Sequence, residues 1–117
     1  MTLDLRLLPR ADLARLVNGA RAVAYLPFDE DSLGYCTMEA FQASKPVLTA
    51  TDAGGVLDIV RDHDTGLVVP PDPQALGSAL TMLTENPSWA SRLGHAGQAA
   101  MKAKKLNWPA TITRLLA

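Results

Sequence analysis

The sequence predicts an α/β fold: a partial Rossmann-like parallel sheet of about four strands, flanked by helices and followed by C-terminal helices. Short apolar runs such as PVLTA (residues 46–50) recur along the first part of the chain, separated by helical patterns. Such runs are typical of parallel strands buried on both faces. With 117 residues, 48% of them hydrophobic, the chain has the size and composition of one globular domain, residues 1–117.

The first half of the chain alternates strand and helix patterns. Residues 3–8 alternate apolar and polar side chains, as a short strand does. Leucines then fall at helical spacing before an Asn18-Gly19 stop. AVAYL is an apolar run closed by Pro27, which predicts a strand buried on both faces. The predicted elements are a strand at 3–8, a helix at 10–20, a strand at 22–26, a helix at 33–43 and a strand at 46–50.

The second half adds one strand and then helices only. A glycine turn and a short helix at 51–60 lead into the apolar strand TGLVV. Asp72 and Pro73 form a helix start, with Asp as N-cap and Pro in the first turn. The predicted elements are a strand at 65–69 and helices starting at Asp72, Pro87 and Asn107.

Composition and charge exclude several function classes. The net charge is −1 and no basic stripe occurs, so we expect no nucleic-acid partner. No apolar run reaches membrane-spanning length, and residues 1–10 lack a signal-peptide pattern. Cys36 is the only cysteine, which leaves no disulfide and no cysteine-based zinc site; we place it in the core. We expect no metal site and a cytoplasmic location.

Ligands of open parallel sheets bind beyond the carboxyl ends of the strands. The loop at 27–33 leads into a helix start at Gly34, where free N–H groups and the helix dipole suit a phosphate. The loop at 51–55 puts Gly54-Gly55 between a strand and a helix, without the G-x-G-x-x-G spacing. The two loops together predict the two walls of a cleft.

Glu39 lies inside a mostly apolar helix, where an unpaired carboxylate is costly. We therefore expect it to meet a ligand, such as a sugar whose hydroxyls donate to carboxylates. Asp31 and Glu39 lie on either side of this helix start, so the two acids could hold opposite ends of an elongated ligand. Asp29, Glu30 and Asp31 are explained equally well as solvated turn acids.

Three further side chains are not expected to belong to the ligand site. His63 and His95 have no acid at ligand spacing and are expected at the surface. Lys45 precedes a strand, which puts it at the edge of the sheet opposite the cleft.

Residues 31–80 closely resemble the donor-binding core of the retaining glycosyltransferases of family 4, which have the GT-B fold. That family carries two glutamates separated by seven residues around a glycine-containing helix start, followed by an ordered series of short motifs. The matching pieces here are Asp31 to Glu39, SKPV (44–47), GGVLDIV (54–60), TGLVV (65–69), PDPQAL (71–76) and Trp108.

The resemblance implies roles for individual residues. Glu39 matches the acid that holds the ribose hydroxyls of a nucleotide-sugar donor, a UDP- or GDP-sugar. Asp31 matches the acid that contacts the transferred sugar, although an inserted residue would make Glu30 the aligned acid. The remaining implied donor-binding residues are Gly34 and Tyr35 near the diphosphate, Gly54 and Gly55 in the same cleft, and Arg10 near the base.

The resemblance also implies hexosyl transfer with retention of configuration, without a metal, a cofactor or a firm protein nucleophile. The family has an acceptor-binding N-terminal domain that this chain does not match, so we expect a C-terminal piece that is inactive alone. An exposed sheet edge could then drive self-association. The full-length protein could lie at the inner face of a membrane.

Two alternatives stay open. One is a non-catalytic interaction or regulatory domain that retains the glycosyltransferase fold, which the shorter first acid, Asp31, would suit. The other is a nucleotide-sugar epimerase on the same fold, although its catalytic acids and histidine have no matching positions here.

Overall fold

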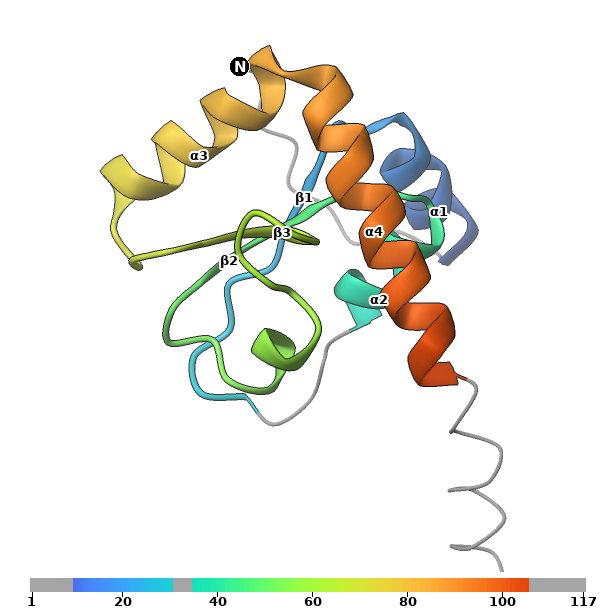
Figure 1. Cartoon of the computed structure of the whole chain (residues 1–117), viewed down its shortest axis with the longest axis horizontal. Helices are drawn as coiled ribbons and strands as arrows, with labels where there is room; N and C mark the ends of the chain where they lie inside the picture. The colour runs from blue at the N-terminus through green and yellow to red at the C-terminus, as the bar shows by residue number, and fades with distance from the viewer. Residues whose placement is uncertain (1–9, 31–34, 106–117) are drawn as a thin grey trace, which may run out of the picture.

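The computed structural model describes residues 10–30 and 35–105, and its elements follow the predicted order (Figure 1). The predicted strand at 3–8 and the helix from Asn107 lie outside the described residues. The elements are α1 (Arg10–Gly19), β1 (Val23–Ala24), α2 (Tyr35–Gln42), β2 (Val47–Ala50), the 3₁₀ helix η1 (Gly55–Asp58), β3 (Gly66–Val69), α3 (Pro73–Glu85) and α4 (Pro87–Lys105).

The three described strands form one parallel sheet in the order β1-β2-β3. Val47 of β2 pairs with Val23 on one side and with Gly66 on the other. All four residues of β2 are buried, as the apolar run predicted for this central strand. The α/β class with a parallel sheet is therefore confirmed.

The prediction that residues 22–26 form a strand buried on both faces is wrong. β1 has two residues, of which Val23 is half-buried and Ala24 is exposed. Leu26, just beyond it, is also exposed. The physical reason is position: among the described strands β1 is the outer one and pairs with β2 alone, so β2 covers only one of its sides.

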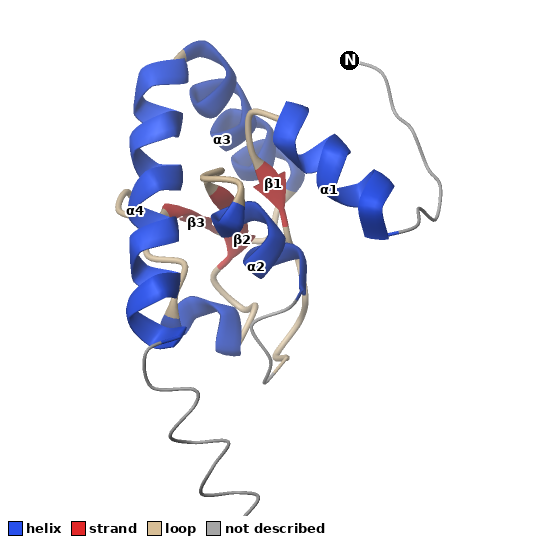
Figure 2. Cartoon of the chain, turned by 90° about the vertical axis from the view of Figure 1, so that its right-hand side faces the viewer, coloured by secondary structure: helices blue, strands red, loops and turns tan. Residues whose placement is uncertain are grey.

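Two apolar clusters lie on the two faces of the sheet. One packs Ala40 and Phe41 of α2 against Val47, and the other packs Leu83 of α3 against Leu48. Neighbouring β2 residues point to opposite faces, which is why consecutive apolar residues serve both clusters. Helices thus cover both faces of the sheet, as expected for this class (Figure 2).

The long helix α4 joins the two clusters. Ala90 and Leu93, near its start, belong to the α3 side, and Met101, near its end, belongs to the α2 side. Figure 2 shows α4 running beside β3, at the opposite side of the sheet from β1. α4 therefore closes the β3 edge of the sheet, whereas no strand among residues 10–30 and 35–105 pairs with the other side of β1.

The start of α3 follows the predicted chemistry. Asp72 is the N-cap, and its carboxylate accepts hydrogen bonds from the backbone N–H groups of Gln74 (2.9 Å) and Ala75 (3.4 Å). Pro73 occupies the first helical position, where no N–H is required.

The prediction that Cys36 belongs to the core is wrong, since the structure places it at the surface. α2 is amphipathic: Thr37, Ala40 and Phe41 are buried, whereas Cys36 and Gln42 are exposed. Helical spacing turns Cys36 away from the face that packs on the sheet.

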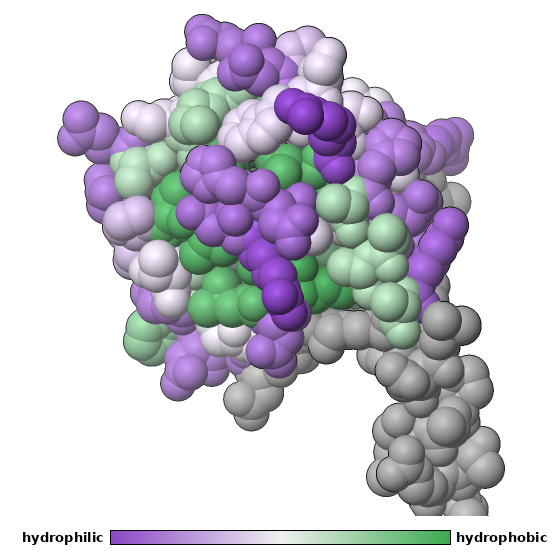
Figure 3. All heavy atoms as spheres, in the orientation of Figure 1, coloured by the Kyte–Doolittle hydropathy of each residue, from purple (hydrophilic) through white to green (hydrophobic). Residues whose placement is uncertain are grey.

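Most of the visible surface is polar, with apolar atoms exposed in the middle of one face (Figure 3). Large apolar side chains that stand out into solvent among the described residues are Leu16, Leu26, Phe28 and Met82. No helix within residues 10–30 and 35–105 has the length and apolar character needed to cross a membrane.

Candidate functional site

The loops after β1 and β2 lie against each other at the carboxyl edge of the sheet. The Asp29 N–H donates to the Asp52 carbonyl (2.8 Å), and the Glu30 N–H donates to the Ala53 carbonyl (2.9 Å). The Glu30 carbonyl in turn accepts from the Gly55 N–H at 2.5 Å. These bonds extend the parallel pairing of the sheet into the loops, where Glu30 and Gly54 form an isolated bridge. The structure thus brings Glu30, Gly54 and Gly55 together.

Gly54 is required by the way these loops approach each other. Its φ is +102°, a conformation that residues with a side chain rarely adopt. A Cβ at this position would lie 2.7 Å from the Glu30 nitrogen and would also overlap the Glu30 carbonyl oxygen. The Gly54-Gly55 turn therefore fixes the distance between the two loops.

Glu39 lies in the second turn of α2 and is half-buried rather than buried. The expectation of a buried Glu39 is wrong, because α2 has an exposed face. Together with Asn18, Gln42 and Ala43, Glu39 lines a pocket of about 150 Å³ between α1 and α2. The other lining residues are Asn18 in the last turn of α1, Gln42 at the end of α2 and Ala43 just after it, so this pocket does not include Glu30 or the glycine turn.

The other predicted site residues are only partly described. Asp31 and Gly34 lie outside the described residues, so the choice between Glu30 and Asp31 stays a prediction. Tyr35 begins α2 and Arg10 begins α1, and the structure describes their backbone only. α1 runs from Arg10 toward the start of β1, so its first residue lies at the end of the helix nearer the carboxyl edge.

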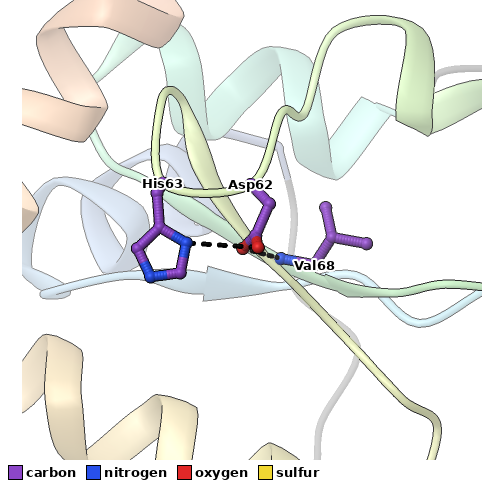
Figure 4. Close-up of polar contacts among 3 residues, drawn as sticks. All are labelled: Asp62, His63 and Val68. Carbon is purple, nitrogen blue, oxygen red and sulfur yellow. Dashed lines mark hydrogen bonds and ion pairs between the residues drawn. The ribbon is translucent and has the colours of Figure 1, made fainter.

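His63 has a carboxylate partner that the sequence reasoning did not find. Its Nδ1 lies 3.1 Å from an Asp62 carboxylate oxygen, and the other oxygen of Asp62 accepts from the Val68 N–H at 2.9 Å (Figure 4). The prediction of a surface histidine is nevertheless confirmed, because its side chain is 61% exposed. Ion pairs this exposed contribute little stability, and the loop lies before β3, away from the candidate cleft.

Within the described residues, no three His, Cys, Asp or Glu side chains gather as a metal site would require. Two buried hydroxyls that the sequence reasoning overlooked, those of Thr37 and Thr49, have no hydrogen-bond partner there. The sequence alone cannot tell whether the hydroxyl of a threonine in an apolar run has a hydrogen-bond partner.

The chain is similar to proteins of known activity. The family described as "Glycosyl transferases group 1" matches residues 6–100. The D-inositol 3-phosphate glycosyltransferase of Thermobifida fusca is 33% identical over 110 residues, which cover 93% of this chain and 24% of that protein. The human α-1,3/1,6-mannosyltransferase ALG2 is 32% identical over 89 residues, 76% of this chain and 21% of that protein.

Two solved structures share the fold. The sucrose-phosphate synthase of Thermosynechococcus elongatus superposes with a TM-score of 0.60 at 30% identity, covering 71% of this chain and 22% of that one. The HepE protein of Anabaena, solved in complex with UDP, superposes with a TM-score of 0.70 at 24% identity over 92% of this chain and 31% of that one. This chain thus spans about a quarter of the length of the curated relatives it matches. On the match over residues 6–100, the chain belongs to the group 1 glycosyl transferase family.

Proposed function

We propose that this chain forms part of the nucleotide-sugar donor site of a retaining glycosyltransferase that transfers a hexosyl group. The observation that carries the proposal is the hydrogen-bonded contact between residues 29–30 and residues 52–55 at the carboxyl edge of the sheet. Open α/β sheets bind ligands at that edge. The family match supports the reaction class, and the UDP in the HepE structure supports a nucleoside diphosphate as the ligand.

In this proposal the acids position the donor. Glu39 accepts hydrogen bonds from the ribose hydroxyls, and Asp31 or Glu30 accepts them from the transferred sugar. The backbone around Gly34 and Tyr35 and the Gly54-Gly55 turn then face the diphosphate and sugar. Arg10 lies near the base.

The departing diphosphate gains negative charge as the glycosidic bond breaks, while the sugar gains oxocarbenium character. N–H groups at a helix start stabilise such a leaving group, and in this proposal the start of α2 assists its departure. We assign no protein nucleophile and no metal to this step. The acceptor binds to a part of the full-length protein outside this chain.

Calorimetric titration of the full-length protein with UDP and GDP tests the proposal. We expect saturable binding of one of them, and Glu39→Gln should weaken it by at least about tenfold, because a bond to a charged acceptor is lost. Glu85→Gln, at the exposed end of α3, is the matched control and should bind as the parent does.

The outcomes separate the proposal from its alternative. If neither nucleotide binds to well-folded protein, the donor-site assignment is wrong and a non-catalytic domain on the glycosyltransferase fold becomes the better account. Equal affinity of the Glu39→Gln and parent proteins would remove Glu39 from the site while leaving the rest of the assignment in place.

A further inference from the structure

A second pocket lies at the amino edge of the sheet, opposite the proposed donor site. Its volume is about 260 Å³, and its lining residues are Arg21, Ser44, Lys45, Pro46, Pro87 and Ser91. The strand register explains how the two cations meet. Arg21 and Lys45 each precede by two residues a member of the Val23–Val47 pair, so parallel pairing puts them at equivalent positions on neighbouring strands.

The charges in this pocket are not balanced by the protein. The lining residues include two cations and no carboxylate. Within residues 10–30 and 35–105, neither the Arg21 nor the Lys45 side chain has an ion-pair partner. Lys45 is half-buried, which strengthens its field relative to a fully solvated lysine. Two neighbouring cations repel each other unless an anion lies between them.

Helix α4 supplies the third wall. Gly94 allows it to approach closely, since a Cβ there would overlap the backbone of Ser44 and Lys45. The first helical residue, Pro87, and Ser91 one turn later both line the pocket. The positive end of the α4 dipole therefore adds to the field of the two side chains.

Ser44 occupies a backbone conformation that favours glycine, with φ of 58°. Its hydroxyl lies on a residue that lines the pocket, as does that of Ser91. The Ser91 hydroxyl also lies 3.4 Å from His95 Nδ1, one turn further along α4. The Ser44 hydroxyl, two cations and a helix start are groups that proteins use to bind phosphate.

We propose that this amino-edge pocket binds a phosphate group, free or carried by a small phosphomonoester. Its volume lies just under the range of about 300–1,000 Å³ typical of pockets for drug-sized ligands, which favours a small anion. The site is separate from the donor cleft because it lies at the other end of the same strands. It depends on the strand register and on α4, and not on the proposed donor chemistry.

Nuclear magnetic resonance of the ¹⁵N-labelled chain, titrated with inorganic phosphate at fixed ionic strength, tests the proposal. We expect saturable shifts of the amides of Ser44, Lys45 and Ser91, which sodium chloride does not reproduce. Lys45→Gln and Arg21→Gln should each raise the phosphate Kd by about tenfold. Lys102→Gln, which removes one charge from an exposed position near the far end of α4, is the matched control and should leave the Kd unchanged.

Ser44→Gly separates binding from folding. Glycine suits φ of 58°, so this variant should be at least as stable as the parent, yet should bind phosphate more weakly because a hydroxyl donor is lost. Binding unchanged in Ser44→Gly, Lys45→Gln and Arg21→Gln would overturn the proposal, as would the absence of any saturable shift.

A second experiment decides whether the phosphate group belongs to a lipid or to a soluble molecule. Co-sedimentation of the chain with vesicles of phosphatidylcholine containing phosphatidic acid, compared with phosphatidylcholine alone, tests a lipid-borne phosphomonoester. Binding to the acidic vesicles that Lys45→Gln abolishes would place the ligand on a lipid head group. Phosphate binding in solution without vesicle binding would support a soluble phosphomonoester.

Discussion

At the scale of single residues, the glycine turn is where sequence and structure agree most closely. The sequence predicted a turn at Gly54-Gly55 that forms one wall of a cleft, with the loop after β1 as the other wall. The structure brings the two loops together through hydrogen bonds to Glu30, and the cleft stays a prediction. The pattern could not tell which glycine is indispensable, because that depends on the approach of Glu30 from a distant part of the chain. The structure singles out Gly54.

We expect Gly54→Ala to lower the free energy of unfolding by more than about 2 kcal/mol, through backbone strain and the overlap with Glu30. Gly77→Ala is the control: it lies inside α3 with open space around it, and alanine there should raise stability by about 0.5–1 kcal/mol. Urea denaturation followed by circular dichroism measures both. Equal effects of the two substitutions would contradict the strained turn.

At the scale of elements, order and type were predictable, but the orientation of α2 was not. Its composition suggested a mostly apolar helix, which led to the prediction that Cys36 and Glu39 are buried. In the structure Cys36 is exposed and Glu39 is half-buried. Eight helical residues are too few for periodicity to define a buried face from the sequence alone, and packing on β1 and β2 decides it.

The α3 N-cap gives a prediction at this scale. Asp72→Ala removes the acceptor for the Gln74 and Ala75 N–H groups and should cost about 1 kcal/mol of stability. Asp72→Asn retains an acceptor and should recover most of that loss. Thermal unfolding of the three proteins checks the order, and an alanine variant as stable as the parent would show that the cap contributes nothing.

The central strand β2 gives another prediction at this scale. Thr49 is fully buried, and its hydroxyl has no partner within the described residues. Thr49→Val keeps the shape and removes an unsatisfied polar group, so we expect a stability gain of about 1 kcal/mol in urea denaturation. A loss of stability would contradict this prediction, since it would mean that the Thr49 hydroxyl does make a hydrogen bond in the folded protein.

At the scale of the whole molecule, the short and partly exposed β1 is the main departure from the sequence prediction of a strand buried on both faces. An apolar run alone does not distinguish a central strand from an edge strand, because the difference lies in what covers it. Leu26 and Phe28, which follow β1 in the chain, are exposed, with Phe28 at 76%.

We expect the isolated chain to self-associate through this edge, since exposed strand edges with apolar neighbours promote pairing. Sedimentation velocity should show a concentration-dependent dimer, and Leu26→Ser with Phe28→Ser should shift it toward monomer. Met82→Ser, an exposed apolar residue on α3, is the control and should not change the distribution. A chain that stays monomeric at high concentration would contradict this prediction.

The central claim is that the carboxyl edge of this sheet binds a nucleoside diphosphate. Amide shift mapping of the full-length protein, with and without UDP or GDP, tests it most directly. We expect shifts concentrated at residues 29–30 and 52–55, with little change at the amides of Ser44 and Lys45 at the opposite edge. Shifts confined to the amino edge, or none at either edge, would contradict it.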